Sequence, residues 1–212
     1  RKRCRHFSGR SVAPFGFFHA CVNSVRKARD CGLSDDAARC KRDQESPAVQ
    51  SGYADFLSRM VWPEMNANTR FKLRPSDHAD YDAIAEIWHG SASLPGVGPR
   101  EMPSLAWLRE RLDREFAAGW AVTVAVEGSA VLGFVAIKPK ESVLDQIFVR
   151  PGWLGRGIGQ ALLAHAKAAM PEGFTLYTRH TNQGARLFYE KAGLHHFRDG
   201  VHSTSGDPIA YY

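Results

Sequence analysis

The last two-thirds of this 212-residue chain contain no cysteine, because Cys4, Cys21, Cys31 and Cys40 all lie near its start. The spacing of these four includes no Cys-x-x-Cys pair and fits no usual zinc pattern. This part of the chain cannot depend on disulfides, which favours a reducing compartment. We therefore expect a cytoplasmic protein. No apolar run reaches the roughly 18 residues that a membrane span needs, so no membrane partner is expected. The scattered histidines predict no metal site.

Net charge is also absent from the chain after residue 70. The whole sequence has a formal net charge of +6, but residues 1–70 hold 13 of the 28 Lys and Arg residues and 7 of the 22 Asp and Glu residues. Residues 71–212 therefore contain 15 of each sign. We expect no nucleic-acid partner for this balanced part of the chain. Binding of DNA by the basic segment 1–42 is kept as a separate alternative.

Residues 1–64 lack a sustained helical or strand period. No methionine precedes Met60, and the first 29 residues carry eight Lys and Arg residues and no acidic one. One interpretation is a basic extension, either disordered or resembling a transit peptide. The other is a misplaced start site, with the natural protein beginning at Met60 or Met65. We favour the second interpretation and place the folded domain at residues 65–212.

From Phe71 the apolar pattern becomes regular and predicts alternating strands and helices. The expected elements are a strand at 71–74, helices at 79–88 and 104–119, a hairpin of 121–126 and 131–138, a strand at 143–149, a helix at 157–170, a strand at 174–178, a helix at 183–192 and two strands within 195–212. The order β-α-α-β-β-β-α-β-α-β-β predicts an α/β (α+β) domain, in which helices cover the faces of a mixed sheet.

Glycines at positions 155, 157 and 159 join the strand at 143–149 to the helix at 157–170. Alternating glycines let backbone N–H groups converge, and the helix start adds its own unpaired N–H groups, so the loop can bind a phosphate or pyrophosphate. A tight turn without a ligand is an equal alternative on this loop alone. A P-loop is excluded because no Gly-Lys-Ser/Thr follows. A dinucleotide fingerprint is excluded because Leu162 occupies the place of its third glycine.

Two motifs together carry a family resemblance. The stretch Val149-x-Pro151-x-x-x-Gly155-x-Gly157-Ile158-Gly159, followed by Ala161-Leu162-Leu163, closely resembles the acyl-CoA-binding motif of the GNAT superfamily of N-acetyltransferases. The stretch Asn182-x-x-Ala185-x-x-Phe188-Tyr189-Glu190-Lys191-Ala192-Gly193-Leu194 is similar to that superfamily's second motif. The resemblance covers residues 71–212. It departs from the pattern at Leu154, where the family usually has Gln or Arg.

The resemblance implies an enzyme that transfers acetyl from acetyl-CoA directly to a primary amine of a small molecule or a protein N-terminus. A non-catalytic acyl-CoA-binding or sensor module on the same fold is the alternative. Dimers are frequent in the superfamily, so a homodimer is compatible with it. The cofactor contacts that it implies are Ile147, Phe148 and Val149 through the strand backbone, Leu154, Gly155, Arg156, Gly157, Ile158, Gly159 and Gln160 around the pyrophosphate, and Asn182 with Phe188.

The resemblance also implies that Tyr189 is the general acid that protonates the departing thiolate, with a buried core aromatic as the alternative. Asp145 is the candidate base, because regular alternation places it on the strand face of Ile147 and Val149. An ordinary salt bridge or a strand-end cap is an equal interpretation of Asp145. Glu141 is a weaker candidate base.

Candidate acceptor-binding residues are Trp88, His89 and Ser91, since they fall in the long first loop where the superfamily builds acceptor specificity. His180 and His202 are expected to be solvated loop residues, because a lone histidine carries little information. The sequence does not identify the amine.

Overall fold

The computed structural model describes residues 70–212, so the four cysteines and the basic segment 1–64 lie outside the described residues. Two antiparallel sheets form its frame. The first has the strand order β1-β2-β3-β4, with β1 at Lys72–Pro75, β2 at Ala121–Glu127, β3 at Ala130–Lys138 and β4 at Val143–Val149. The second has the order β5-β7-β6, with β5 at Tyr177–Arg179, β6 at Arg198–Val201 and β7 at Pro208–Tyr211.

The helices are α2 at Tyr81–Ala92, α3 at Leu105–Ala117, α4 at Ile158–Ala169 and α5 at Gln183–Lys191, with 3-10 turns η1 at His78–Asp80, η2 at Pro139–Glu141 and η3 at Pro151–Trp153. The predicted order of strands and helices is thus confirmed. Ser104 caps α3, since its hydroxyl accepts a hydrogen bond of 3.1 Å from the Trp107 amide. Within residues 70–212, no helix combines the length and the apolarity that crossing a bilayer would require.

Helix α2 ends at Ala92, four residues later than the expected end at Trp88. The buried face that begins with Ile84 continues through Ser91 and Ala92, so packing against the sheet favours a further turn of helix. The helix stops where the Ser93 amide donates to the His89 carbonyl. The expectation that His89 and Ser91 lie in a loop was therefore wrong.

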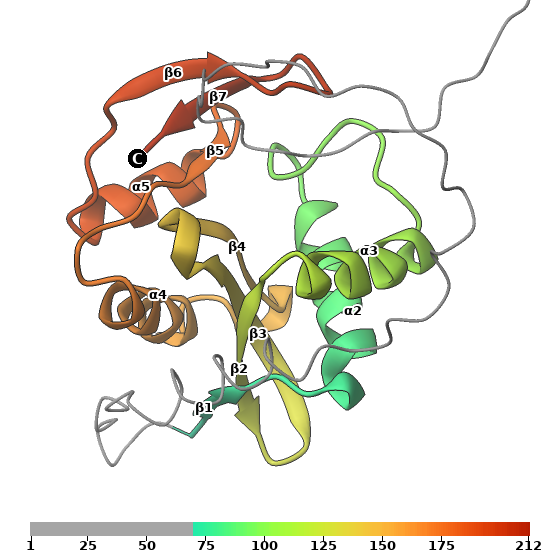
Figure 1. Cartoon of the computed structure of the whole chain (residues 1–212). Coiled ribbons are helices and arrows are strands. Elements are labelled where there is room, and N and C mark those ends of the chain that lie inside the picture. The colour runs from blue at the N-terminus through green and yellow to red at the C-terminus, as the bar shows by residue number, and fades with distance from the viewer. Residues whose placement is uncertain (1–69) are drawn as a thin grey trace, which may run out of the picture.

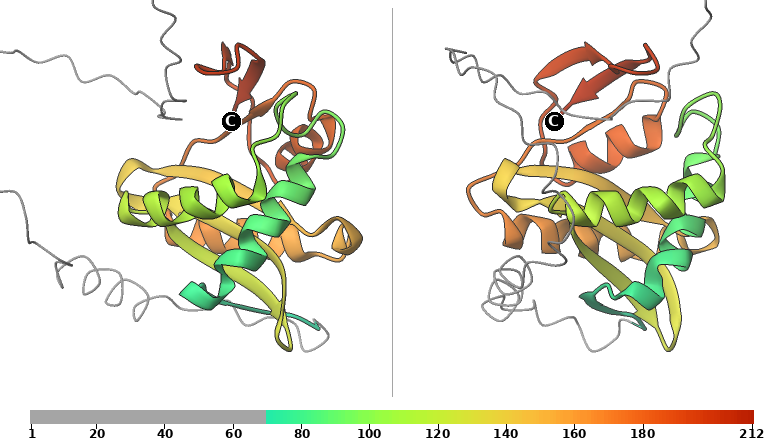
Figure 2. Two further views of the ribbon diagram at one scale, coloured as in Figure 1. Left: turned by 90° about the vertical axis from the view of Figure 1, so that its right-hand side faces the viewer. Right: turned by 45° about the vertical axis from the view of Figure 1, so that its right-hand side comes forward.

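Two buried clusters cover the two faces of the first sheet. Because side chains alternate along a strand, Val124 and Phe134 face α2 and α3, whereas Ala125 and Val135 face α4. Figures 1 and 2 show α2 and α3 crossing one face of this sheet and α4 lying behind the other face. The fully buried Leu162 of α4 illustrates the energetics, since burying one such side chain contributes roughly 1.5–3 kcal/mol.

The expected mixed sheet is realised as two sheets that meet at a single parallel bridge. Val143 at the start of β4 bridges Thr175, and the Leu144 amide donates to the Thr175 carbonyl at 3.0 Å. Within the described residues, no ladder joins β4 to β5 beyond this point. The two strands therefore separate, and Figure 1 shows β5 and α5 on the far side of the gap from β4.

Candidate active site

A cavity of about 590 Å³ opens between β4 and β5 where the strands separate. Its wall includes most of the residues singled out in the sequence: Trp88, Ser91, Asp145, Ile147, Phe148, Val149, Leu154, Gly155, Gly157, Ile158, Gly159, Gln160, Asn182, Phe188 and Tyr189. His89 and Arg156 are absent from this wall. Residues of α2, β4, α4 and α5 thus converge on one space.

The glycine loop forms one part of the wall. Gly155 and Gly157 have φ angles of +76° and +81°, a left-handed conformation that other residues rarely adopt. Gly157 provides no side-chain cap for α4, and the Ala161 amide makes the first helical bond, to the Gly157 carbonyl at 3.0 Å. The amides of residues 158–160 therefore have no acceptor within the helix. This loop can bind an anion through backbone N–H groups and the helix dipole.

The space beside the glycines is open. A Cβ at Gly155 would meet nothing within 4 Å, and one at Gly157 would meet no atom closer than 3.9 Å. A side chain there would project into the open space instead of into protein. Leu154 is 58% exposed, and the Arg156 guanidinium lies 4.4 Å from the centre of the Trp153 ring, which does line the cavity. Arg156 thus contacts a residue of the cavity wall without lining the cavity itself.

The outer edge of β4 forms a second part of the wall. The Arg150 amide donates to Leu132 on β3, so alternation turns the backbone groups of Phe148 toward β3 as well. The backbone groups of Ile147 and Val149 then face the cavity. The expected backbone contacts at Ile147 and Val149 fit this geometry, whereas Phe148 contributes a side chain that packs toward α2.

Ser91 fixes the end of this strand. Its hydroxyl donates a hydrogen bond of 2.9 Å to the Val149 carbonyl, and the residue is 5% exposed. The described geometry therefore gives Ser91 a positioning contact to β4 in addition to its place in the cavity wall. His89, earlier on α2, lies outside that wall.

Asp145 lies at a β-bulge. The register passes from Ala136 opposite Gln146 to Ile137 opposite Leu144, which leaves Asp145 as the extra residue of β4. A bulge redirects the side chains that follow it. Leu144 before the bulge and Ile147 and Val149 after it consequently pack in the same α4 cluster, whereas Asp145 contacts Trp120 of the opposite cluster. The expectation that Asp145 shares the face of Ile147 and Val149 was therefore wrong.

The carboxylate of Asp145 has two close partners. The Trp120 indole N–H donates to its Oδ2 at 2.7 Å, and the Lys138 ammonium lies 3.7 Å from the same oxygen. Burial raises the pKa of Asp145 above its usual value, and Lys138 and Trp120 oppose that rise by favouring the charged form. A carboxylate with a raised pKa beside a cavity is suited to accept a proton. The salt-bridge interpretation and the base interpretation are both compatible with this geometry.

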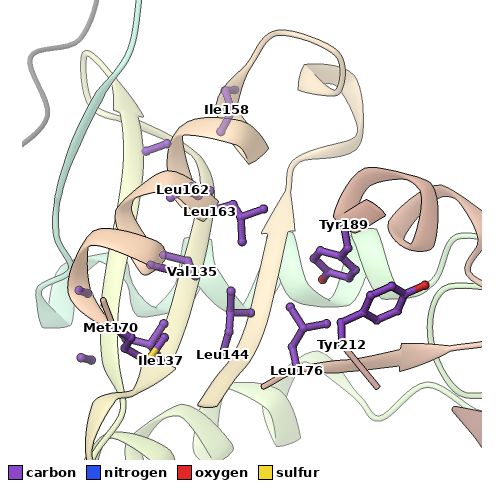
Figure 3. Close-up of a cluster of buried hydrophobic side chains, with 14 of the residues drawn as sticks. Val135, Ile137, Leu144, Ile158, Leu162, Leu163, Met170, Leu176, Tyr189 and Tyr212 are labelled. Carbon is purple, nitrogen blue, oxygen red and sulfur yellow. The ribbon is translucent and has the colours of Figure 1, made fainter. Parts of the chain in front are cut away.

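Tyr189 extends from α5 toward β4 (Figure 3). It is 6% exposed and lines the cavity, and its ring lies 5.6 Å from that of Tyr212. Burial raises the pKa of Tyr189 well above its usual value, so the phenol remains protonated at neutral pH. Tyr189 is therefore a core aromatic whose protonated phenol borders the cavity.

Asn182 and Phe188 line the cavity from the α5 side. The Asn182 side chain accepts from the Ala185 amide at 3.1 Å, which caps α5. A Cβ added at Gly159 would lie 3.5 Å from the Phe188 ring, so the two elements pack closely at this point. Glu141 lies in η2 and His180 hydrogen-bonds Asp199, and neither lines the cavity.

Four ionisable residues of the cavity wall were not predicted as site residues from the sequence: Arg111, Tyr177, Arg179 and His202. His202 was expected to be solvated, but it is 4% exposed and its ring lies 5.9 Å from that of Tyr177. Burial lowers the pKa of His202, and the positive charge of nearby Arg179 lowers it further. The signal for Arg111 was its place on the apolar face of α3, between Leu108 and Leu112. Among the described residues, no group of three His, Cys, Asp or Glu side chains is arranged to hold a metal.

Comparisons with known proteins agree on one family. The model of the acetyltransferase (GNAT) family matches residues 81–194. An acetyltransferase from Thermus thermophilus superposes with a TM-score of 0.56 at 21% identity, over 70% of this chain and 97% of that one. YjaB of Escherichia coli superposes with a TM-score of 0.51 at 23% identity, over 66% of this chain and 95% of that one. A search of curated proteins found no match.

A further solved structure, yncA of Salmonella typhimurium with its cofactor acetyl-CoA, superposes with a TM-score of 0.51 at 16% identity. It covers 67% of this chain and 91% of that one. At these identities the three structures establish a common fold.

Proposed function

The chain belongs to the GNAT family of acetyltransferases, and from this premise we propose that it transfers acetyl from acetyl-CoA to a primary amine within a ternary complex. The observation that carries the proposal is the cavity at the separation of β4 and β5, which joins the anion-binding loop at Gly155–Gly159 to Asp145 and Tyr189. The protein N-terminus and the small-molecule amine are both kept as acceptor classes. The reducing cytoplasm is the compartment that suits a domain whose residues 71–212 lack cysteine.

When bound, acetyl-CoA supplies the thioester whose acyl carbon an amine attacks, so that a C–N bond forms, the C–S bond breaks and CoA leaves as the thiol. The amides of Gly159 and Gln160, with the helix dipole of α4, would hold the pyrophosphate. The open edge of β4 at Ile147 and Val149 would hold the pantetheine arm by backbone hydrogen bonds, and its outward N–H groups would polarise the acyl carbonyl.

Asp145 and Tyr189 would then divide the proton transfers between them. Asp145 would accept the proton that the amine loses, since burial has raised the pKa of its carboxyl toward the working range. Tyr189 would donate a proton to the departing sulfur, because its phenol stays neutral in its buried position. Positioning of amine and thioester side by side supplies the remainder of the rate enhancement.

The test is a thiol-release assay with acetyl-CoA and a library of primary amines, together with calorimetric titration of the full chain with acetyl-CoA. Binding of acetyl-CoA and acceptor-dependent release of CoA are the expected results. Binding without thiol release for any amine would instead support the non-catalytic acyl-CoA-binding module. Absence of binding would contradict both functions.

A further inference from the structure

Two arginines from separate elements line the same cavity as Asp145. Arg111 comes from α3 and Arg179 from the last residue of β5. Neither belongs to the glycine loop or to the pair of proton-transfer residues. Because the cofactor loop and the proton-transfer residues are already assigned, these arginines are candidates for contact with the acceptor.

Arg111 is held rigidly in the wall. It is 8% exposed, its guanidinium carbon lies 4.8 Å above the Trp88 ring, and its Nε donates to Glu115 at 3.0 Å. A guanidinium fixed by stacking and by an ion pair loses little further entropy on binding a ligand. The Arg111 guanidinium is therefore already in place before a ligand binds.

Arg179 lines the cavity from β5. Its side chain is 15% exposed, and its Nε donates to Asp207 at 3.0 Å. Because alternate side chains of a strand share a face, Arg179 lies on the same side of β5 as Tyr177. The charges of Arg111 and Arg179 both lower the pKa of Tyr177 in opposition to burial, which raises it to about 12. The two arginines therefore act on the same end of the cavity.

This end is also the end where Asp145 lies. Asp145 and Tyr177 each follow the Val143–Thr175 bridge by two residues, on the two strands that diverge from it. The charge of Asp145 adds to the rise in the pKa of Tyr177. One carboxylate and two guanidinium groups thus surround the space next to Tyr177.

The charged partners that pair with these groups do not line the cavity. Among the described residues, the charged side chains that line the cavity are Arg111, Asp145 and Arg179, whereas Glu115, Lys138 and Asp207 do not line it. The wall that a ligand meets therefore presents two guanidinium groups and one carboxylate, and Glu115 and Asp207 offset part of the guanidinium charge without lining the cavity themselves. A low-dielectric pocket of this kind favours a ligand with an anionic group.

We propose that the acceptor bears a carboxylate in addition to its primary amine, so that it is an amino acid or a related amino-carboxylic acid. Arg111 and Arg179 bind the carboxylate, for which the guanidinium fork is a matched donor, and Asp145 faces the amine. The inference rests on the proposed acetyl transfer. A polyamine would place a second cation against two arginines, and like charges in a buried site disfavour that class.

The experiment compares acceptors in matched pairs that differ only at the carboxylate. Glycine, β-alanine and 4-aminobutanoate, with a panel of larger α-amino acids, are each assayed beside the corresponding carboxamide by thiol release. We expect kcat/KM to favour the acid over its amide by about tenfold or more, as loss of a charge-assisted hydrogen bond implies. The length of the preferred acid reports the separation of the amine and carboxylate subsites.

Variants identify the residues responsible. Arg179→Gln and Arg111→Gln should raise KM for the acids about tenfold or more and leave KM for the amides and the Kd for acetyl-CoA unchanged. Arg179→Lys should restore part of the preference. Arg109→Gln is the matched control, because Arg109 lies on the same helix and pairs with Asp82 and Asp113 outside the cavity.

A binding measurement separates this inference from the proposed transfer. Calorimetry of the CoA-loaded protein with the same acids and amides reports recognition even where no thiol is released. Binding of acids but not amides, weakened in Arg179→Gln, supports a carboxylate acceptor site even if turnover fails. Equal binding or turnover of acids and amides, a preference for amides, or no binding of any acid overturns it.

Discussion

The indole N–H of Trp120 donates a hydrogen bond of 2.7 Å to Oδ2 of Asp145, at the bulged residue of β4. Trp120 immediately precedes β2, so the contact ties the candidate base to the centre of the sheet. A hydrogen bond to a carboxylate favours its charged form. Trp120 therefore limits how far burial can raise the pKa of Asp145.

Replacing Trp120 by Phe should move the acidic limb of the pH profile to higher pH. The substitution removes the indole N–H, so the opposing contribution disappears and burial raises the pKa of Asp145 further. The profile of kcat/KM against pH measures the shift. Trp107→Phe is the control, since Trp107 packs on the same cluster without contacting Asp145. An identical profile for Trp120→Phe and wild type would exclude Asp145 as the titrating base.

Replacing Asp145 by Asn should lower kcat by about 100-fold or more, the usual contribution of a general base, and stabilise the fold at neutral pH. The folded protein raises the pKa of Asp145 above its usual value of 3.8. Its stabilising contribution is therefore complete below pH 3.8 and is lost as pH rises through the folded-state pKa. A neutral amide avoids that loss.

Urea unfolding at several pH values measures this effect. The stability gained by Asp145→Asn should be larger at about pH 7 than at about pH 5, and should shrink further as the pH falls toward the usual pKa of the carboxyl. A loss of stability at neutral pH would mean that the contact between Asp145 and Lys138 outweighs the cost of burial. In that case Asp145 would be mainly a structural ion-pair partner.

Replacing Tyr189 by Phe should lower kcat by about 100-fold or more while the Kd for acetyl-CoA stays unchanged. The substitution keeps the ring that packs in the core and removes the proton donor. Tyr212→Phe is a matched control, because Tyr212 adjoins Tyr189 but hydrogen-bonds Glu190 and does not line the main cavity. Equal turnover in the two variants would leave Tyr189 as a core aromatic alone.

The sequence predicted the parts of the site that are contiguous in the chain. The glycines at 155–159 and the helix that carries Tyr189 each lie within one local motif, so their pattern could be read directly. Arg111 and Arg179 could not be paired in this way, because α3 and β5 lie far apart in the sequence and only the fold brings both to one cavity. The grouping is a property of the tertiary structure.

Local irregularity explains the remaining errors. A bulge at Asp145 breaks the alternation on which its predicted face depended. Packing of Ser91 and Ala92 against the sheet extends α2 through Gly90, a residue that usually weakens a helix. His202 is buried and its ring lies against Tyr177 of β5, a contact that no residue next to it in the sequence signals.

Replacing Gly157 by Ala should weaken acetyl-CoA binding more than it weakens the fold. At φ of +81° a Cβ costs about 1–2 kcal/mol of conformational energy, and it also projects into the space proposed for the pyrophosphate. Gly128→Ala is the matched control, since its φ is +60° in the β2–β3 turn and its Cβ meets nothing within 4 Å.

Both alanine variants should lose similar stability in urea unfolding, and only Gly157→Ala should raise the Kd for acetyl-CoA, by about tenfold or more. Titration calorimetry at a temperature where both variants are folded measures the difference. Unchanged affinity in Gly157→Ala would place the pyrophosphate away from this loop.

The hydroxyl of Thr181 donates to the Gly96 carbonyl at 2.8 Å and joins the loop between α2 and α3 to the start of α5. Both segments border the cavity, which Leu94 and Pro99 line on one side and Asn182 on the other. Thr181→Val keeps the shape of the side chain and removes the donor. Loss of one exposed hydrogen bond of about 0.5–1.5 kcal/mol should speed amide exchange in residues 94–103 about two- to tenfold.

The same change should raise KM for the acceptor by a similar factor, because a looser loop holds the acceptor end of the cavity less firmly. Hydrogen exchange followed by mass spectrometry separates loop 94–103 from β2 and β3, whose exchange should not change. Ser93→Ala is the matched control, since the Ser93 hydroxyl bonds the His89 carbonyl within its own helix end and does not cross the cavity. Equal exchange of the loop in Thr181→Val and Ser93→Ala would show that the contact to Gly96 does not hold the two walls together.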